Sequence, residues 1–252
     1  KPSLAANNQL IETTKDAKVY YQNQSNRFKA NFAHQPKDQL MDFNCQESSI
    51  SMKLEDNLKS NISGKVAEQK MKYSEILSST DIEYQVLDNG VKETIILKDQ
   101  NAPEKITFRI TANNLNWQAK KNGRIDFYSS QDHELLFYIN PLYTTDAAGK
   151  TVDAVTLSLE EEQDGLVYTI NIDKQKLNEK SYPVCIDPTV TIAPNAAESM
   201  DVEIFADQDE DDNAGASPYI YIHQGHNAYS EIRGLFKFNL SSLPPGAINS
   251  AY

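Results

Sequence analysis

The stretch DIEYQVLDNGVKETIILK, residues 81–98, decides the fold class of this chain. Apolar side chains such as Ile82 and Tyr84 recur at every second position on both sides of Asn89-Gly90. In an extended strand, this spacing places them all on one face. An Asn-Gly pair supplies the positive φ angles of a type I′ turn. The stretch therefore predicts a β-hairpin with one buried face and a turn at Asn89-Gly90.

Two further turn pairs lie between alternating segments. They are Asn122-Gly123 and Asp164-Gly165. The same alternation occurs without such a pair in residues 28–32 and 106–110. Helix signals are confined to two short segments, residues 53–61 and 173–180. The pattern predicts an all-β chain of antiparallel β-sandwich type, built from hairpins, with one face of each sheet buried.

The composition predicts a domain boundary in the segment TVTIAPNAAES, residues 189–199, where an apolar strand pattern gives way to small residues and a proline. We expect a β-rich domain over residues 18–192 and the first strands of a second, incomplete β-sandwich module over 193–252. Residues 1–17 read as a mobile polar lead-in.

The formal net charge of −12 is concentrated toward the end of the chain. Residues 181–252 hold ten acidic side chains against only Arg233 and Lys237. Such a field repels phosphate backbones, which predicts that nucleic acid is not a partner. The longest apolar runs also fall far short of the roughly 20 residues of a membrane helix, so no membrane span is expected.

The two cysteines, Cys45 and Cys185, are too far apart in sequence for a CxxC zinc or redox motif. A single disulfide between them and two separate thiols both remain open. Catalytic motifs are also lacking, because no serine or cysteine stands in a nucleophile-elbow pattern. The acid and base groups of QDHEL, residues 131–135, read as a polar hairpin loop. The sequence therefore predicts no catalytic residues.

A run of acidic residues is the candidate metal site. In DQDEDDN, residues 207–213, the side chains of Asp207, Asp209 and Asp211 alternate. Oxygen ligands at this spacing suit calcium, although the EF-hand pattern fails because Asp212 occupies its glycine position. The alternative is a solvated acidic loop. Calcium is the one cofactor to which the sequence points.

Tyrosines of the C-terminal segment are the candidate ligand-binding residues. Tyr219, Tyr221 and Tyr229 stand close together in sequence. Exposed aromatic rings stack on the CH faces of sugars, while the tyrosine hydroxyls make polar contacts. The alternative is a sandwich strand with a half-buried tyrosine face. Nearby, His223 and His226 lack the further ligands that a zinc site requires, and they read as surface histidines.

Two resemblances to known families give these patterns a context. Residues 19–190 resemble the N-terminal β-rich region of bacterial cell-wall-associated and Rhs/YD-repeat proteins. The segments that carry this resemblance are residues 81–98, GRIDFYSSQDHELLFYINPLYTTDAAGK (123–150) and SYPVCIDPTV (181–190). Cys185, at a variable position of the family pattern, and the divergent stretch 33–70 depart from it.

Residues 198–252 resemble the start of a DNRLRE-type domain, a β-sandwich module related to carbohydrate-binding modules. The matches include Asp201, Ile204 and the strand at 233–240, and Ala214 departs from the usual aromatic. Because such a module normally has more than twice as many residues as remain here, the resemblance implies that it is cut short at residue 252.

Together the resemblances imply a noncatalytic structural or attachment region of a large bacterial protein, secreted or held at the cell wall or cell surface. The parent would be similar to Rhs/YD-repeat polymorphic toxins, with its toxic activity elsewhere. The expected partners are the remainder of that polypeptide, or a complementing chain, and a wall or matrix glycan. Two alternatives stay open: a hydrolase of cell-wall polysaccharides, and an interaction module completed by a strand from a partner.

Overall fold

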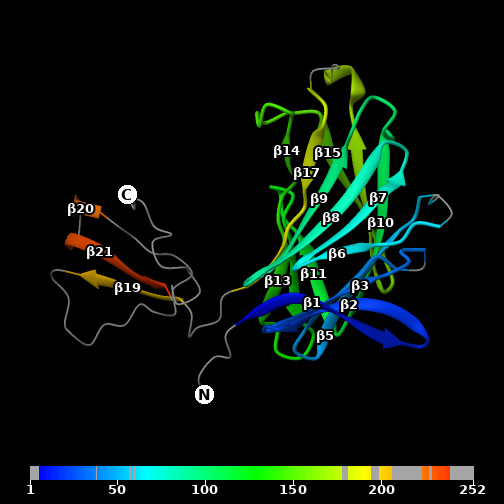
Figure 1. Cartoon of the computed structure of the whole chain (residues 1–252). Coiled ribbons are helices and arrows are strands. Elements are labelled where there is room, and N and C mark those ends of the chain that lie inside the picture. The colour runs from blue at the N-terminus through cyan, green and yellow to red at the C-terminus, as the bar shows by residue number, and fades with distance from the viewer. Residues whose placement is uncertain are drawn as a thin grey trace. The chain divides into compact units, whose positions relative to one another are not determined.

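The computed structural model describes residues 6–37, 39–56, 58, 61–177, 181–193, 199–205, 223–226 and 229–238. The chain divides into two compact units, Lys1–Ala193 and Pro194–Tyr252 (Figure 1). The sequence places this boundary between residues 192 and 193. Each unit is described by itself below.

The prediction of an all-β chain is confirmed. Every strand pair in the described ranges is antiparallel, and the one helical element there is a 3-10 turn, η1 (Lys174–Lys176). This turn lies within the predicted helical segment 173–180. The other segment, 53–61, begins inside a strand instead. Strand formation dominates because most of the described chain alternates between inward apolar and outward polar side chains.

The first sheet of the N-terminal unit begins with a five-stranded meander. In sheet order its strands are β1 (Asn7–Lys15), β2 (Lys18–Ser25), β3 (Phe28–Ala33), β4 (Met41–Cys45), β5 (Ser48–Leu54), β10 (Lys105–Asn113), β16 (Gly165–Ile172) and β15 (Val155–Glu162). The last three strands come from later in the chain, so distant segments complete this sheet.

The second sheet also combines strands from distant parts of the chain. Its main path runs β11 (Leu115–Ala119), β12 (Ile125–Ser129), β13 (Leu135–Ile139), β18 (Val190–Ile192), β9 (Gly90–Leu97), β8 (Thr80–Leu87), β7 (Lys70–Leu77) and β6 (Lys65–Ala67). Beside this path, β17 (Val184–Asp187) pairs with β9 and with β14 (Tyr143–Thr145). The chain therefore passes repeatedly between the two sheets.

One apolar core lies between the two sheets. The ring of Phe32 on β3 lies 5.1 Å from that of Tyr84 on β8, centre to centre. Phe43 on β4 lies 5.1 Å from Phe137 on β13 in an edge-on contact. These aromatic pairs join the inner faces of opposite sheets and belong to one continuous cluster of buried side chains. The predicted β-sandwich architecture is therefore confirmed for this unit.

The three predicted hairpins form, but their turns differ from the predicted ones. Leu87 pairs with Gly90, so the turn residues are Asp88 and Asn89 and the glycine already belongs to β9. Gly165 likewise opens β16, opposite Glu162. The hairpin from β11 to β12 closes through a longer loop, 120–124, with Gly123 at φ 88°.

Close approach of a neighbouring strand explains two of these glycines. A Cβ added to Gly90 would fall within 3.0 Å of the backbone oxygen of Val190 on β18. A Cβ on Gly165 would meet the backbone oxygen of Ile110 on β10 in the same way. The neighbouring strands therefore fill the space that any side chain at these positions would require.

The segment predicted as a polar lead-in, residues 1–17, contains a strand in its described part. Asn7–Lys15 is strand β1 and pairs with β2 along most of its length. A two-residue turn joins the strands, with positive φ angles at Asp16 (50°) and Ala17 (60°). Leu10 is the one well-buried side chain of β1, at 6% exposure. Edge strands need few apolar residues because backbone hydrogen bonds hold them to one neighbour. The polar composition of residues 7–15 therefore gave no indication of a strand.

The open question about the cysteines also has an answer in this structure. Cys45 lies in β4 of the first sheet and Cys185 in β17 of the second, and both are free thiols. Cys45 is buried in the core. The two residues therefore act as separate thiols, and no covalent link joins the sheets through them.

The C-terminal unit contains a three-stranded antiparallel sheet in its described residues. Its order is β19 (Ser199–Phe205), β21 (Tyr229–Phe238) and β20 (His223–His226). The strand β21 includes residues 233–238 of the stretch 233–240, in which the resemblance to a DNRLRE-type module places a strand. Whether this sheet is part of an incomplete module stays a prediction.

The glycine contacts generate a stability prediction. Replacing Gly90 by alanine should lower the free energy of unfolding of the N-terminal unit by about 3 kcal/mol or more, because the new methyl group forces β9 away from β18. Denaturant unfolding followed by fluorescence measures this unit alone, since Trp117 in β11 is the single tryptophan of the chain.

Gly149→Ala is the matched control, because Gly149 has a positive φ of 74° but nothing within 4 Å of an added Cβ. It should cost only the backbone strain, about 1 kcal/mol. Equal losses in the two variants would contradict the close-approach explanation.

Candidate functional site

Most of the predicted site residues lie outside the described part of the chain. These are Asp207, Asp209, Asp211, Tyr219 and Tyr221. Tyr229 opens β21, where the backbone alone is described, opposite His226 of β20. The calcium site and the tyrosine platform for sugar therefore stay predictions. Within the described residues, no group of three or more His, Cys, Asp or Glu side chains could hold a metal ion.

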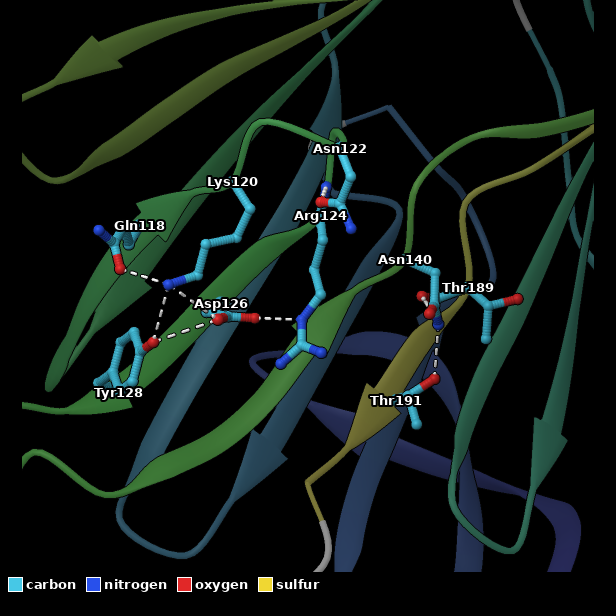
Figure 2. A network of polar contacts seen from close by, with 9 residues as sticks. All are labelled: Gln118, Lys120, Asn122, Arg124, Asp126, Tyr128, Asn140, Thr189 and Thr191. Carbon is cyan, nitrogen blue, oxygen red and sulfur yellow. Dashed lines mark hydrogen bonds and ion pairs between the residues drawn. The ribbon is translucent and has the colours of Figure 1, made fainter. Parts of the chain in front are cut away.

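A polar network on the outer face of the second sheet is centred on Asp126 of β12 (Figure 2). Its carboxylate accepts hydrogen bonds from Arg124 Nε and, at 3.1 Å, from the hydroxyl of Tyr128. The ammonium of Lys120 lies 3.4 Å from the same carboxylate and donates to Gln118 Oε1 at 2.5 Å. Asp126 is 3% exposed despite its place on the outer face, because these longer side chains cover it.

Strand register brings this network together. Gln118 of β11, Asp126 of β12 and Tyr138 of β13 are direct neighbours in register. The guanidinium of Arg124 lies 3.8 Å from the centre of the Tyr138 ring, a cation–π contact. The buried carboxylate thus has two cationic partners, and each of these also lies over an aromatic ring, Lys120 over that of Tyr128 at 5.8 Å. The arrangement stabilises the three strands and leaves no lone acid or base for proton transfer at Asp126.

A smaller group of contacts continues along the same sheet. The amide of Asn140 donates to the backbone oxygen of Thr189 at 3.0 Å and to the hydroxyl of Thr191 at 2.7 Å (Figure 2). Asn140 directly follows β13, and Thr191 lies in β18. These bonds hold the segment after β13 against β18, so this group is also best explained as structural.

The most unusual ionisable group of the described chain is Glu93, which points into the core. It lies on β9 at 2% exposure, in register with Tyr84 of β8. The Tyr84 hydroxyl donates to Glu93 Oε1 at 2.7 Å. Burial raises the pKa of Glu93 from 4.5 to about 8, against the opposing effect of this hydrogen bond. Glu93 is therefore largely protonated at neutral pH.

Tyr168, on the opposite sheet, is the second tyrosine whose pKa depends on this carboxyl group. Tyr168 on β16 is 2% exposed, and its hydroxyl has no hydrogen-bond partner among the described residues. Burial raises the pKa of Tyr168, and the negative charge of ionised Glu93 raises it further. Since neither group reaches the surface, they affect the stability of the core rather than a reaction with a substrate.

The buried carboxyl predicts a pH dependence of stability. Because the pKa of Glu93 is higher in the folded state, the folded chain binds more protons between pH 4.5 and about 8, and its stability falls as the pH rises through this window. Glu93→Gln keeps the acceptor oxygen but cannot ionise. It should remove a loss on the order of 3–5 kcal/mol between pH 5 and pH 9, measured by denaturant unfolding with Trp117 fluorescence.

The control for this prediction is Glu83→Gln on β8, whose carboxylate pairs with Lys70 at 3.1 Å on the outer face. This exposed pair should contribute little, so the variant should keep the pH dependence of the unmodified chain. If Glu93→Gln showed the same fall in stability with pH as Glu83→Gln, the inward placement of Glu93 would be wrong.

Two neighbouring carboxylates with opposite pKa shifts border a hollow of about 580 Å³ after β5. A hydrogen bond from Arg109 lowers the pKa of Glu55, and burial raises that of Asp56. Asp56 Oδ2 also accepts the backbone N–H of Thr107 at 2.8 Å. Opposed shifts in a hollow are typical of acid–base pairs in enzymes. Here, however, Arg109 binds Glu55 and also contacts Glu162, so the first carboxylate is already in an ion-pair network.

Neither cysteine has the character of a nucleophile. Burial raises the pKa of the Cys45 thiol and that of the Cys185 thiol. Because the thiolate is the reactive form, both side chains are less reactive than an ordinary cysteine at neutral pH. The loop with the sequence QDHEL joins β12 to β13 and exposes its polar side chains, in agreement with its interpretation as a hairpin loop.

Sequence reasoning missed the groups that the structure makes most conspicuous. Glu93 has the same parity as Val91 and Ile95, so alternation places it inward, but its charge argued for the other face. Asp126 is buried by side chains whose convergence depends on strand register. The pairing of Glu55 with Arg109 depends on β5 lying beside β10, which no local pattern indicates.

Comparison with protein-family models and with curated proteins gives no match for this chain. The family resemblances therefore rest on the quoted residues. In the part of the chain that the structure describes, no helix has the length and apolar character needed to cross a bilayer.

Proposed function

We propose that this chain is a noncatalytic structural and attachment region of a large bacterial protein that is secreted or displayed at the cell surface. The parent is a wall-associated or Rhs/YD-repeat protein similar to polymorphic toxins, with its toxic activity in another segment. The N-terminal sandwich acts as a stiff spacer. The C-terminal module binds carbohydrate, with Tyr219, Tyr221 and Tyr229 as its contact residues and calcium at Asp207, Asp209 and Asp211.

The observation that supports this proposal most directly is how the acidic groups of the described sandwich are used. Glu93 is buried on the inner face of β9, and Asp126 is covered by Lys120 and Arg124. On the same sheet, Asp81 pairs with Lys72 at 3.2 Å and Lys98 at 2.8 Å. Ion pairs of this kind hold strands together and leave their carboxylates unavailable for acid–base chemistry.

Mechanical stiffness follows from the way in which the sandwich is built. Both sheets join strands that are distant in sequence, as where β10 lies between β5 and β16. The two sheets also share one apolar core, so separating them requires that core to break as a unit. A spacer between an anchored part and an effector part of one polypeptide needs this property.

A sedimentation assay with an activity readout tests the proposal. The 252-residue chain is mixed with insoluble peptidoglycan and wall polysaccharides, and both pelleted protein and soluble reducing ends are measured. We expect the chain to pellet with at least one of these materials while reducing ends stay at the level of a heat-denatured control. Failure to pellet with any of them would contradict the attachment role.

The hollow beside β5 favours one alternative, a polysaccharide hydrolase with Asp56 as the acid and Glu55 as its partner. The raised pKa of Asp56 suits a general acid, and the lowered pKa of Glu55 suits a carboxylate that stays ionised. In the same assay, the release of reducing ends by the unmodified chain and its loss in Asp56→Asn would support the hydrolase. The structural proposal expects both proteins to be equally inactive.

A further inference from the structure

A second hollow, of about 400 Å³, lies on the outer face of the first sheet, across β1 to β4. Its lining is composed mainly of uncharged hydrogen-bonding side chains, one of them a tyrosine, with two lysines and one carboxylate. The residues closest to the centre of the proposal are Tyr20, Gln22, Asn31, Asp42 and Asn44. None of them belongs to the core or to the networks described above.

Strand register arranges three of these residues in a row. Gln22 of β2 is opposite Asn31 of β3, and Asn31 is opposite Asp42 of β4. Ser51 of β5 continues the row. Neighbouring strands lie about 4.8 Å apart, so the row presents a polar group at intervals comparable to the width of a sugar ring.

Hydrogen bonds along the row fix the orientation of its side chains. Gln22 Nε2 donates to Asn31 Oδ1 at 2.6 Å, and the Ser51 hydroxyl donates to Asp42 Oδ1 at 2.5 Å. Asn44, on the same strand as Asp42, donates to the backbone oxygen of Lys29 at 3.4 Å. The side chains are therefore held in position before any ligand arrives, which lowers the entropic cost of binding.

Each of these groups keeps one hydrogen-bonding function unused. Among the described residues, no hydrogen bond is made by Gln22 Oε1, Asn31 Nδ2, Asp42 Oδ2 or Asn44 Oδ1. The hollow thus offers three acceptor oxygens and the amide nitrogen of Asn31, all of which already have fixed directions. Adjacent hydroxyl groups of a sugar, which both donate and accept, complement such a set.

The charges of the hollow nearly balance, because its lining holds two lysines, Lys15 and Lys29, and one carboxylate, Asp42. Asp42 lies in the row itself and repels anions. The ammonium of Lys29 is bound to the backbone oxygens of Asn23, at 3.0 Å, and Gln24, at 2.6 Å. Two of the three donors of Lys29 are therefore used on backbone oxygens of β2, which leaves Lys15 as the other cation of the lining. A neutral ligand suits a lining with so small a net charge.

Apolar surface lies next to the polar row, as sugar binding requires. Tyr20 lines the hollow, and its ring can cover the CH face of a pyranose. Ile11 of β1 is opposite Gln22 in register and is 42% exposed, which is unusual for a large apolar side chain in this chain. The row of amides thus ends beside an exposed apolar side chain.

We propose that this hollow is a binding site for a neutral polysaccharide, with Gln22, Asn31, Asp42 and Asn44 contacting its hydroxyl groups and Tyr20 contacting a ring face. The site belongs to the N-terminal sandwich and is independent of the tyrosines of the C-terminal module. The spacer would then also be an attachment surface.

Native affinity electrophoresis of the whole chain tests this site. Gels contain a soluble neutral polysaccharide, namely a β-glucan, a mannan, a xylan or a galactan, or the anionic polygalacturonate as a comparison. We expect at least one neutral polysaccharide to retard the chain. The double substitution Asn31→Ala with Asn44→Ala should weaken that retardation at least about tenfold in apparent affinity, the equivalent of about 1.4 kcal/mol.

Two variants make the result specific. Asn171→Ala changes an outward amide on β16 of the same sheet, which is bonded to Ser158 at 2.9 Å but lies away from the hollow, and it should leave retardation unchanged. The triple variant of Tyr219, Tyr221 and Tyr229 to alanine should also keep the retardation due to the hollow. Trp117 fluorescence checks that the variants of the N-terminal unit are folded, and circular dichroism does so for the tyrosine variant.

Several outcomes would overturn the site. These are no retardation by any neutral polysaccharide, equal retardation of the Asn31/Asn44 variant and the unmodified chain, and retardation lost only in the tyrosine variant. The last result would leave the proposed function of the C-terminal module intact. Retardation by polygalacturonate alone, strengthened in Asp42→Asn, would show that the hollow takes an anion and would overturn the neutral assignment.

Discussion

The contact between inward-facing aromatic side chains of opposite sheets is the constraint on which the rest of this structure depends. Phe32 meets Tyr84 and Phe43 meets Phe137, so the two inner faces are matched across the core. Because side chains alternate along a strand, a shift of one residue in any strand would send its apolar set into solvent. The core therefore fixes the register of every strand that contributes to it, and register in turn decides what each outer face presents.

This register gathers different polar groups on different parts of the outer faces. Both sheets carry charged groups that pair with one another, as Asp126 does with Lys120 on the second and Arg109 with Glu55 on the first. Over β2 to β5 the first sheet also presents a row of amides and hydroxyls. Ion pairs between strands stabilise a spacer, and directed neutral polar groups are suited to binding hydroxyl-rich ligands. One sandwich can thus combine both roles on separate surfaces.

Local sequence patterns predict the strands of this chain better than they predict which strands pair with one another. Alternation and the turn pairs correctly indicate hairpins such as β8–β9, since both strands and their turn are contiguous. Pairing between distant strands, such as β5 with β10, depends on packing that no local pattern contains. The candidate sites follow the same division. The row from Gln22 to Ser51 forms only because the strands pair in this register. The inward position of Glu93 follows from its alternation with Val91 and Ile95, although its charge favours the outer face.

Native-state hydrogen exchange tests most directly whether the two sheets form one cooperative unit. The backbone amides of Phe43 in β4 and Phe137 in β13 lie in opposite sheets whose side chains share the core. If that core joins the sheets, both amides should exchange with the same free energy, equal to that of global unfolding of the N-terminal unit. Exchange of one sheet at a much lower free energy than the other would contradict a single sandwich held together by its inward aromatic side chains.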